Sequence, residues 1–216
     1  MKIFMGENYS CDVNYQYYQI IYKLQEIEDC EFVEQPEDAD VIIFASTCSC
    51  YEARIYEILS YIDSVLKQKK LEAKTYLTGC LARGFLNPDL FSIVIDWLNT
   101  HIDYIIPNNQ TDDLLRKLLN DKYNEISSKP GFAFSFEENK AHIYISSGCL
   151  HKCSFCKTNF QKTPLVSIDI SEVKEYIDII DAEKIENLVF LGMNISQFGL
   201  DTHQEYLLPS IIDYAE

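Results

Sequence analysis

The run Val41-Ile42-Ile43-Phe44-Ala45 is apolar at every position. A strand with one solvent-exposed face alternates apolar and polar residues, whereas a continuous apolar run is typical of a parallel strand covered by helices on both faces. Around this run, short β-rich segments alternate with longer amphipathic ones through about the first 125 residues. The sequence therefore predicts an α/β domain built from βα units, with an open parallel sheet.

Hydrophobic periods define the expected elements of this domain. We predict strands at Lys2–Met5, Glu31–Val33, Val41–Ala45, Lys74–Leu77 and Tyr104–Ile106. We predict helices at Tyr15–Glu28, Tyr51–Lys69, Asp89–Asn99 and Asp112–Glu125. One apolar stripe, at three- and four-residue intervals, runs along the second helix through Ile55, Ile58, Leu59, Ile62 and Leu66.

A second domain is expected after the turn-forming segment Ile126–Gly131, where the hydrophobic period is lost. We place the boundary between residues 1–128 and 129–216. In the second domain we predict strands at His142–Ser146 and Leu188–Leu191 and helices at Ile170–Ile180 and His203–Tyr214. Asp169 or Ser171 is the expected N-cap of the first of these helices.

The charge balance is strongly acidic. The chain has 34 Asp and Glu against 18 Lys and Arg, a net charge of −16, spread along its length. Such a surface repels phosphate backbones, so the chain by itself is a poor candidate for tight nucleic-acid binding.

Cysteine usage points to metal or redox chemistry. The N-terminus lacks the apolar run of a signal peptide, and no apolar stretch approaches the ~20 residues of a membrane span, so we expect a cytoplasmic protein without membrane contact. Disulfides are rare in that compartment. The eight cysteines are therefore expected to include metal ligands or catalytic thiols.

Three cysteines of the first domain share one position relative to the predicted strands. Cys11, Cys48 and Cys80 each lie in the loop after a strand, and the carboxyl ends of parallel strands meet at one edge. Three thiolates there would select zinc, copper(I) or an iron-sulfur cluster. The alternative is that they are small buried hydrophobic residues. We expect Cys30 and Cys50 to be structural, although Cys50 could replace Cys48 as a ligand.

The second cysteine group is more closely spaced. Cys149, Cys153 and Cys156 form C-x3-C-x2-C directly after a predicted strand, and no cysteine follows. The ferredoxin spacing and the second pair of a zinc ribbon are both missing. His151 could be a fourth ligand, but we expect it to face solvent. Three thiolates around a 4Fe-4S cluster leave one iron open, as a catalytic metal centre requires.

The segment CLHKCSFC at 149–156 resembles the cluster loop of the radical-SAM superfamily. The wider pattern resembles one branch, the methylthiotransferases, which insert a methylthio group into tRNA bases or a ribosomal protein. Five further segments carry this resemblance in the family's order: CDVN at 11–14, ADVIIFASTC at 39–48, TGC at 78–80, HIDYIIP at 101–107 and LGMNISQFGLD at 191–201.

The resemblance implies two 4Fe-4S clusters. The first would be held by Cys149, Cys153 and Cys156 with S-adenosylmethionine on its fourth iron, and the auxiliary cluster by Cys11, Cys48 and Cys80. By family analogy, a deoxyadenosyl radical abstracts hydrogen from the substrate, and sulfur arrives through the auxiliary cluster. The implied substrate is a tRNA base or, as the less common target, a ribosomal protein or peptide.

The resemblance also implies cofactor contacts. Gly192 and Asn194 would lie near the amino-acid end of S-adenosylmethionine, and Phe155 near its adenine. No residue is assigned a direct catalytic role. Met193 stands where the family commonly has Gln, Ser10 replaces a usual Gly, and the family's arginines after the third cysteine are missing. A tRNA phosphate contact at that loop is therefore less expected here.

The second domain is short for a radical-SAM barrel. A βα unit takes about thirty residues, so only two units fit after His142. We expect the first βα units of an incomplete barrel, in a chain that is incomplete and inactive alone, with its open sheet edge covered by a missing segment or a partner chain. Two other classes stay open: an iron-sulfur electron-transfer or redox-sensing protein, and a zinc-stabilised binding module.

Overall fold

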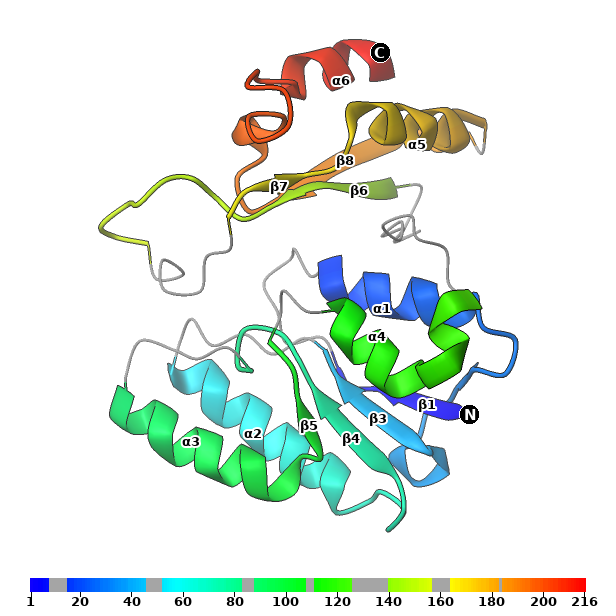
Figure 1. Ribbon diagram of the computed structural model, residues 1–216, viewed down its shortest axis with the longest axis vertical. Helices are drawn as coiled ribbons and strands as arrows, with labels where there is room; N and C mark the ends of the chain where they lie inside the picture. The colour runs from blue at the N-terminus through cyan, green and yellow to red at the C-terminus, as the bar shows by residue number, and fades with distance from the viewer. Residues whose placement is uncertain are drawn as a thin grey trace. The chain divides into compact units, whose positions relative to one another are not determined.

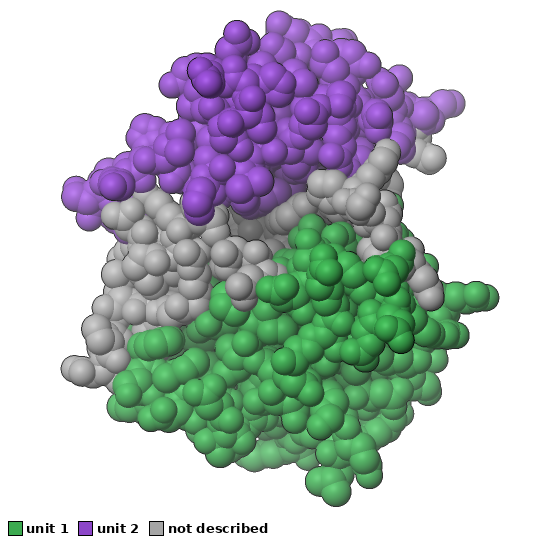
Figure 2. Space-filling model, in the orientation of Figure 1, with its two compact units in different colours: residues 1–129 green, residues 130–216 purple. Residues whose placement is uncertain are grey.

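The computed structural model divides the chain into two compact units, residues 1–129 and 130–216 (Figure 2). It describes residues 1–7, 15–45, 52–82, 88–107, 111–125, 140–156, 164–182 and 184–216. The predicted boundary segment, Ile126–Gly131, lies outside the described residues. Within those ranges no helix is long and apolar enough to span a membrane.

Unit 1 contains a five-stranded sheet in which every pair of neighbours is parallel (Figure 1). The strand order is β2-β1-β3-β4-β5. The strands are β1 (Lys2–Met5), β2 (Glu31–Phe32), β3 (Val41–Phe44), β4 (Lys74–Leu77) and β5 (Tyr104–Ile105). Because the order reverses between β1 and β3, this pair is a topological switch point, where ligands bind beyond the carboxyl ends of the strands.

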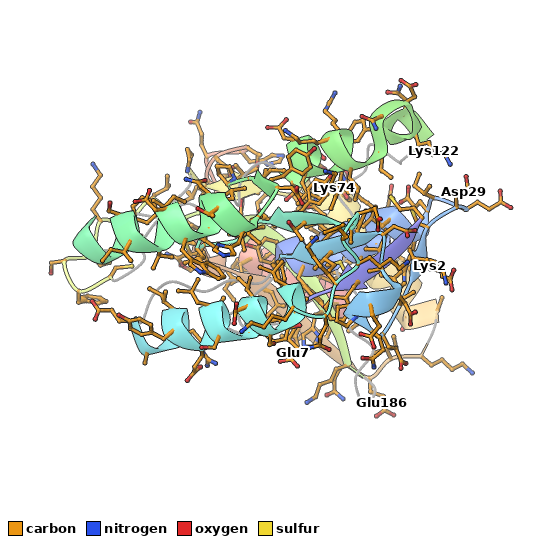
Figure 3. All side chains as sticks on the ribbon, turned by 90° about the horizontal axis from the view of Figure 1, so that it is seen from below. Lys2, Glu7, Asp29, Lys74, Lys122 and Glu186 are labelled. Atoms are coloured by element: carbon orange, nitrogen blue, oxygen red, sulfur yellow. The ribbon has the colours of Figure 1, made fainter. Side chains whose placement is uncertain are left out.

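Helices cover both faces of this sheet (Figure 1). One face packs against α1 and α4 and the other against α2 and α3. The helices of unit 1 are α1 (Tyr15–Gln25), α2 (Glu52–Leu66), α3 (Pro88–His101) and α4 (Thr111–Leu119), with short 3-10 turns η1 (Pro36–Asp38) and η2 (Asn120–Glu125). An ion pair between Lys122 and Asp29 joins η2 to the turn after α1 (Figure 3).

The uniformly apolar strand β3 explains this two-sided arrangement. Val41 and Ile43 are buried in the core formed with α1 and α4. Ile42 and Phe44 are buried in the opposite core, with α2 and α3. The predicted α/β class and open parallel sheet are therefore confirmed, and each strand of unit 1 begins where the sequence placed it.

Helix ends differ more from the prediction. Helix α1 ends at Gln25 and α2 at Leu66, each three residues early, and the helix predicted over Asp112–Glu125 continues beyond Leu119 as the 3-10 turn η2. The fully buried face of α2 consists of Ile55, Ile58, Ile62 and Val65, whereas Leu59 and Leu66 are only partly buried.

Unit 2 is a three-stranded sheet covered by two helices. Strand order is β7-β6-β8, with β6 and β8 parallel and connected through α5. The elements are β6 (Lys140–Ser147), β7 (Val166–Ser167), α5 (Ile170–Ala182), β8 (Asn187–Gly192), η4 (Ile195–Gln197) and α6 (Leu208–Ala215). Strands β6 and β8 begin two residues and one residue earlier than predicted. Strand β7, which was not predicted, pairs antiparallel with β6. Within the described residues β8 is an edge strand and the sheet is open.

Asp169 caps α5. The backbone N–H and the hydroxyl of Ser171 both donate to Asp169 Oδ1, at 2.8 and 2.5 Å. These two hydrogen bonds hold the pKa of the Asp169 carboxyl below its usual value, and the bond from the Ser171 hydroxyl has the larger effect. Of the two N-cap candidates, the structure thus selects Asp169.

Gly199 is required by its surroundings. It has φ of +91°, and a Cβ there would lie 2.5 Å from Leu207 Cγ and 2.8 Å from the Glu205 carbonyl oxygen. Gly199→Ala is therefore expected to lower the free energy of unfolding by about 3 kcal/mol, from backbone strain and overpacking together. Urea unfolding followed by circular dichroism measures this loss. The control is Ser210→Ala on the exposed side of α6, and a Gly199→Ala protein as stable as that control would contradict the expectation.

Candidate metal centre

The carboxyl ends of β1, β3 and β4 lie level at one edge of the unit 1 sheet. Met5 pairs with Ile43, and Phe44 pairs with Leu77. Pairing continues one residue further, because the Gly6 N–H donates to the Ile43 carbonyl at 2.9 Å. The Glu7 N–H then donates to the Tyr61 hydroxyl at 2.8 Å, tying the end of β1 to α2. The loops that carry Cys11, Cys48 and Cys80 therefore all begin at this edge.

Cys80 is the member of this group that the structure describes. It is half-buried and follows Gly79, whose φ of +90° turns the chain out of β4. Cys11, Cys48 and the alternative ligand Cys50 lie outside the described residues. The shared edge supports a common site, and the ligand set itself stays a prediction.

Cys30 has a different environment. It is half-buried against the core that contains α1 and α4, and its N–H donates to the Ile27 carbonyl at 2.9 Å. Burial raises the pKa of its thiol above the usual value. A half-buried thiol with a raised pKa fits a packing role rather than metal ligation.

The second cysteine group forms a loop at the carboxyl end of β6. Gly148, with φ of +74°, turns the chain out of the strand. Cys149, Cys153 and Cys156 are each half-buried, and the Cys156 N–H donates to the Cys153 carbonyl at 3.1 Å. The other side chains of the loop are exposed, namely Leu150, His151, Lys152, Ser154 and Phe155. The loop thus withdraws its cysteines from solvent relative to their neighbours.

The donor chemistry of this loop fits an iron-sulfur cluster. None of the five described cysteines forms a disulfide. Within the described residues, no three His, Cys, Asp or Glu side chains are already gathered as a metal site. Metal binding commonly organises its own ligands, and three thiols within eight residues of one loop are the soft donors that zinc and iron-sulfur clusters select.

The end of β8 adjoins this loop. Gly192 pairs with Ser146 of β6, and a Cβ on Gly192 would lie 2.8 Å from both the carbonyl and hydroxyl oxygens of Ser146. That hydroxyl is buried and has no hydrogen-bond partner among the described residues. The Asn194 Nδ2 donates to Cys149 Sγ at 3.6 Å. Two of the expected cofactor residues therefore lie at the cysteine loop.

Phe155 differs from these two residues. Its side chain is 86% exposed. The structure therefore does not bring Phe155 into the group formed by Gly192, Asn194 and Cys149, and its contact with adenine stays a prediction.

Comparison with known proteins shows which proteins the chain resembles. Residues 3–88 match the model described as Uncharacterized protein family UPF0004. The tRNA-2-methylthio-N(6)-dimethylallyladenosine synthase of Campylobacter concisus is 25% identical over 186 residues, covering 83% of this chain and 41% of that protein. The ribosomal protein uS12 methylthiotransferase RimO of Clostridium novyi is 28% identical over 202 residues, covering 88% and 44%. The chain is similar to methylthiotransferases over most of its length. It spans about two fifths of the length of these curated relatives.

A buried glutamine at the cysteine loop was not predicted from the sequence. Gln197 is 3% exposed, and its Oε1 accepts a hydrogen bond from the Leu150 N–H at 2.9 Å. The available signal was weak, because Gln197 is a single polar residue beside Phe198 in the segment that follows a predicted strand. Sequence alone does not show that such a residue is buried or what it contacts.

The final part of the segment at 191–201 has a structural role in unit 2. Asp201 accepts hydrogen bonds from the N–H and the hydroxyl of Ser167, at 2.8 and 2.5 Å. The Gly199 N–H donates to the same hydroxyl at 3.0 Å. These contacts tie β7 to the turn after β8, so Gly199 and Asp201 stabilise unit 2.

Proposed function

We propose that this chain carries the cluster-binding portion of a radical-SAM methylthiotransferase, which converts a C–H bond of its substrate into C–SCH3. The observation that carries the proposal is the loop after β6. In this loop Cys149, Cys153 and Cys156 are half-buried, and the Asn194 amide, just after β8, donates a hydrogen bond to Cys149 Sγ. Similarity to methylthiotransferases supports the same chemistry.

Each part of the loop has a defined task in this proposal. The three cysteines would supply thiolates to a 4Fe-4S cluster, leaving one iron for S-adenosylmethionine. When bound, that pair supplies the radical that removes hydrogen from the substrate. Gly192 permits close approach at the end of β8, because a side chain there would collide with Ser146. Asn194 and Phe155 would contact the cofactor, and Cys11, Cys48 and Cys80 would hold the auxiliary cluster that supplies sulfur.

A tRNA base is the proposed substrate. The Campylobacter relative is named for a modified adenosine of tRNA. A ribosomal protein is the second candidate, because the Clostridium relative is named for protein uS12. The net charge of −16 favours this second candidate, since it disfavours an RNA backbone. Because thiolate ligands must stay reduced, we also propose a cytoplasmic location.

Anaerobic reconstitution with iron and sulfide tests the proposal. We expect a brown protein with about eight irons, as two 4Fe-4S clusters require. Added S-adenosylmethionine should change the electron paramagnetic resonance spectrum of the reduced protein, because it binds an open iron. A colourless protein that takes up only zinc would establish the binding-module alternative. Iron loading without any response to S-adenosylmethionine would establish the electron-transfer alternative.

A further inference from the structure

The turn after β8 holds the cysteine loop through two successive residues. Gln197 Oε1 accepts from the Leu150 N–H at 2.9 Å, and Asn194 Nδ2 donates to Cys149 Sγ at 3.6 Å. Cys149 and Leu150 are adjacent in sequence but 45 and 47 residues from these partners. Two long-range contacts on consecutive residues fix both the position and the direction of the chain there.

A third side chain orients the amide that faces sulfur. The Ser196 hydroxyl donates to Asn194 Oδ1 at 2.7 Å. Because the oxygen of the Asn194 amide is engaged in this way, its NH2 group is directed to Cys149 Sγ. We call Asn194, Ser196 and Gln197 the turn clamp.

Because Gln197 is buried, losing its hydrogen bond to the Leu150 N–H would be costly. Its side chain is 3% exposed, and a buried amide is costly unless it is hydrogen-bonded. Replacing Gln197 with an apolar residue would leave the Leu150 N–H without its acceptor. The loop would then lose the restraint on the residue that follows its first cysteine.

We propose that the turn clamp positions Cys149 and raises the reduction potential of the cluster that Cys149 would ligate, an inference that rests on the proposed function. A hydrogen bond to a ligand sulfur stabilises the more negative, reduced cluster, so it shifts the midpoint potential upward. Asn194 thus acts on the cluster through Cys149. Gln197 acts on the loop backbone and is a positioning residue.

Two measurements on the reconstituted protein test the clamp. Asn194→Ala should lower the midpoint potential in a titration followed by electron paramagnetic resonance, at unchanged iron content, and Ser196→Ala should lower it by a smaller shift. Gln197→Leu should release iron to a chelator about fivefold faster, as loss of one buried hydrogen bond implies. Gln197→Glu keeps an acceptor oxygen and should restore slow release.

Met193→Leu is the matched control, because Met193 lies in the same turn and is 46% exposed. It should match the wild-type protein in both measurements. Suppose that the wild-type protein loads iron. If Asn194→Ala and Ser196→Ala then have the wild-type midpoint potential, or Gln197→Leu has the wild-type rate of iron release, the clamp is overturned while the proposed function stands. If the wild-type protein loads no iron on Cys149, Cys153 and Cys156, both fail together.

Discussion

Replacing Cys149, Cys153 and Cys156 together with alanine is expected to remove about half of the iron from the reconstituted protein, about four of eight atoms. The three thiols belong to one loop, and a 4Fe-4S cluster that has lost all three of its protein ligands is lost to chelators and solvent. The same variant should no longer respond to S-adenosylmethionine, because the open iron belongs to this cluster. Iron and sulfide analysis after gel filtration measures the loss.

The reciprocal variant, with alanine at Cys11, Cys48 and Cys80, should lose the other half and keep the response to S-adenosylmethionine. Cys30→Ala is the control, since Cys30 is a half-buried cysteine that packs against the unit 1 core. Loss of all iron from either triple variant, or of none, would contradict two independent clusters. If Cys50→Ala removed the auxiliary cluster and Cys48→Ala did not, the ligand assignment would move by two residues.

The first unit was predictable because its determinants are local. A continuous apolar run such as Val41–Ala45 is enough to indicate that both faces of a strand are buried, and in the structure its residues are divided between two cores. Cys80 could likewise be placed from its distance beyond β4 alone. Helix ends were less predictable, because α1 and α2 both end before their amphipathic pattern does.

The contacts around the cysteine loop were not predictable, because they join residues far apart in sequence. Strand β7 is two residues long and shows no period, and it is held by Asp201, 34 residues from Ser167. Gln197 acquires its role only when the chain brings Leu150 to it. Motif resemblance located the segment at 191–201 and assigned Asn194 a cofactor contact, but it did not show that Asn194 contacts a cysteine or that Gly199 is required by packing against Leu207.

The polypeptide of residues 1–216 is expected to form 5′-deoxyadenosine about a hundredfold more slowly than a complete methylthiotransferase with the same iron content. In unit 2, β8 is an edge strand among the described residues, and all six of its residues are at least partly exposed. An exposed edge leaves backbone donors and acceptors unpaired, so we expect a further strand or a partner chain to cover it.

Turnover is expected to be slow because the site is open to solvent on one side. Phe155 in the cysteine loop and Met193 directly after β8 are both exposed, so a cofactor held there would face solvent. Water and small reductants then reach reactive species that a closed site protects. The measurement is chromatography of 5′-deoxyadenosine from reduced, reconstituted protein, with the Clostridium relative assayed alongside and the triple variant at Cys149, Cys153 and Cys156 as the blank. Turnover equal to that of the relative would contradict the expectation. In that case gel filtration would show whether a second copy of the chain covers β8, because a dimer could supply the missing wall whereas a monomer would have to close the site with its own residues.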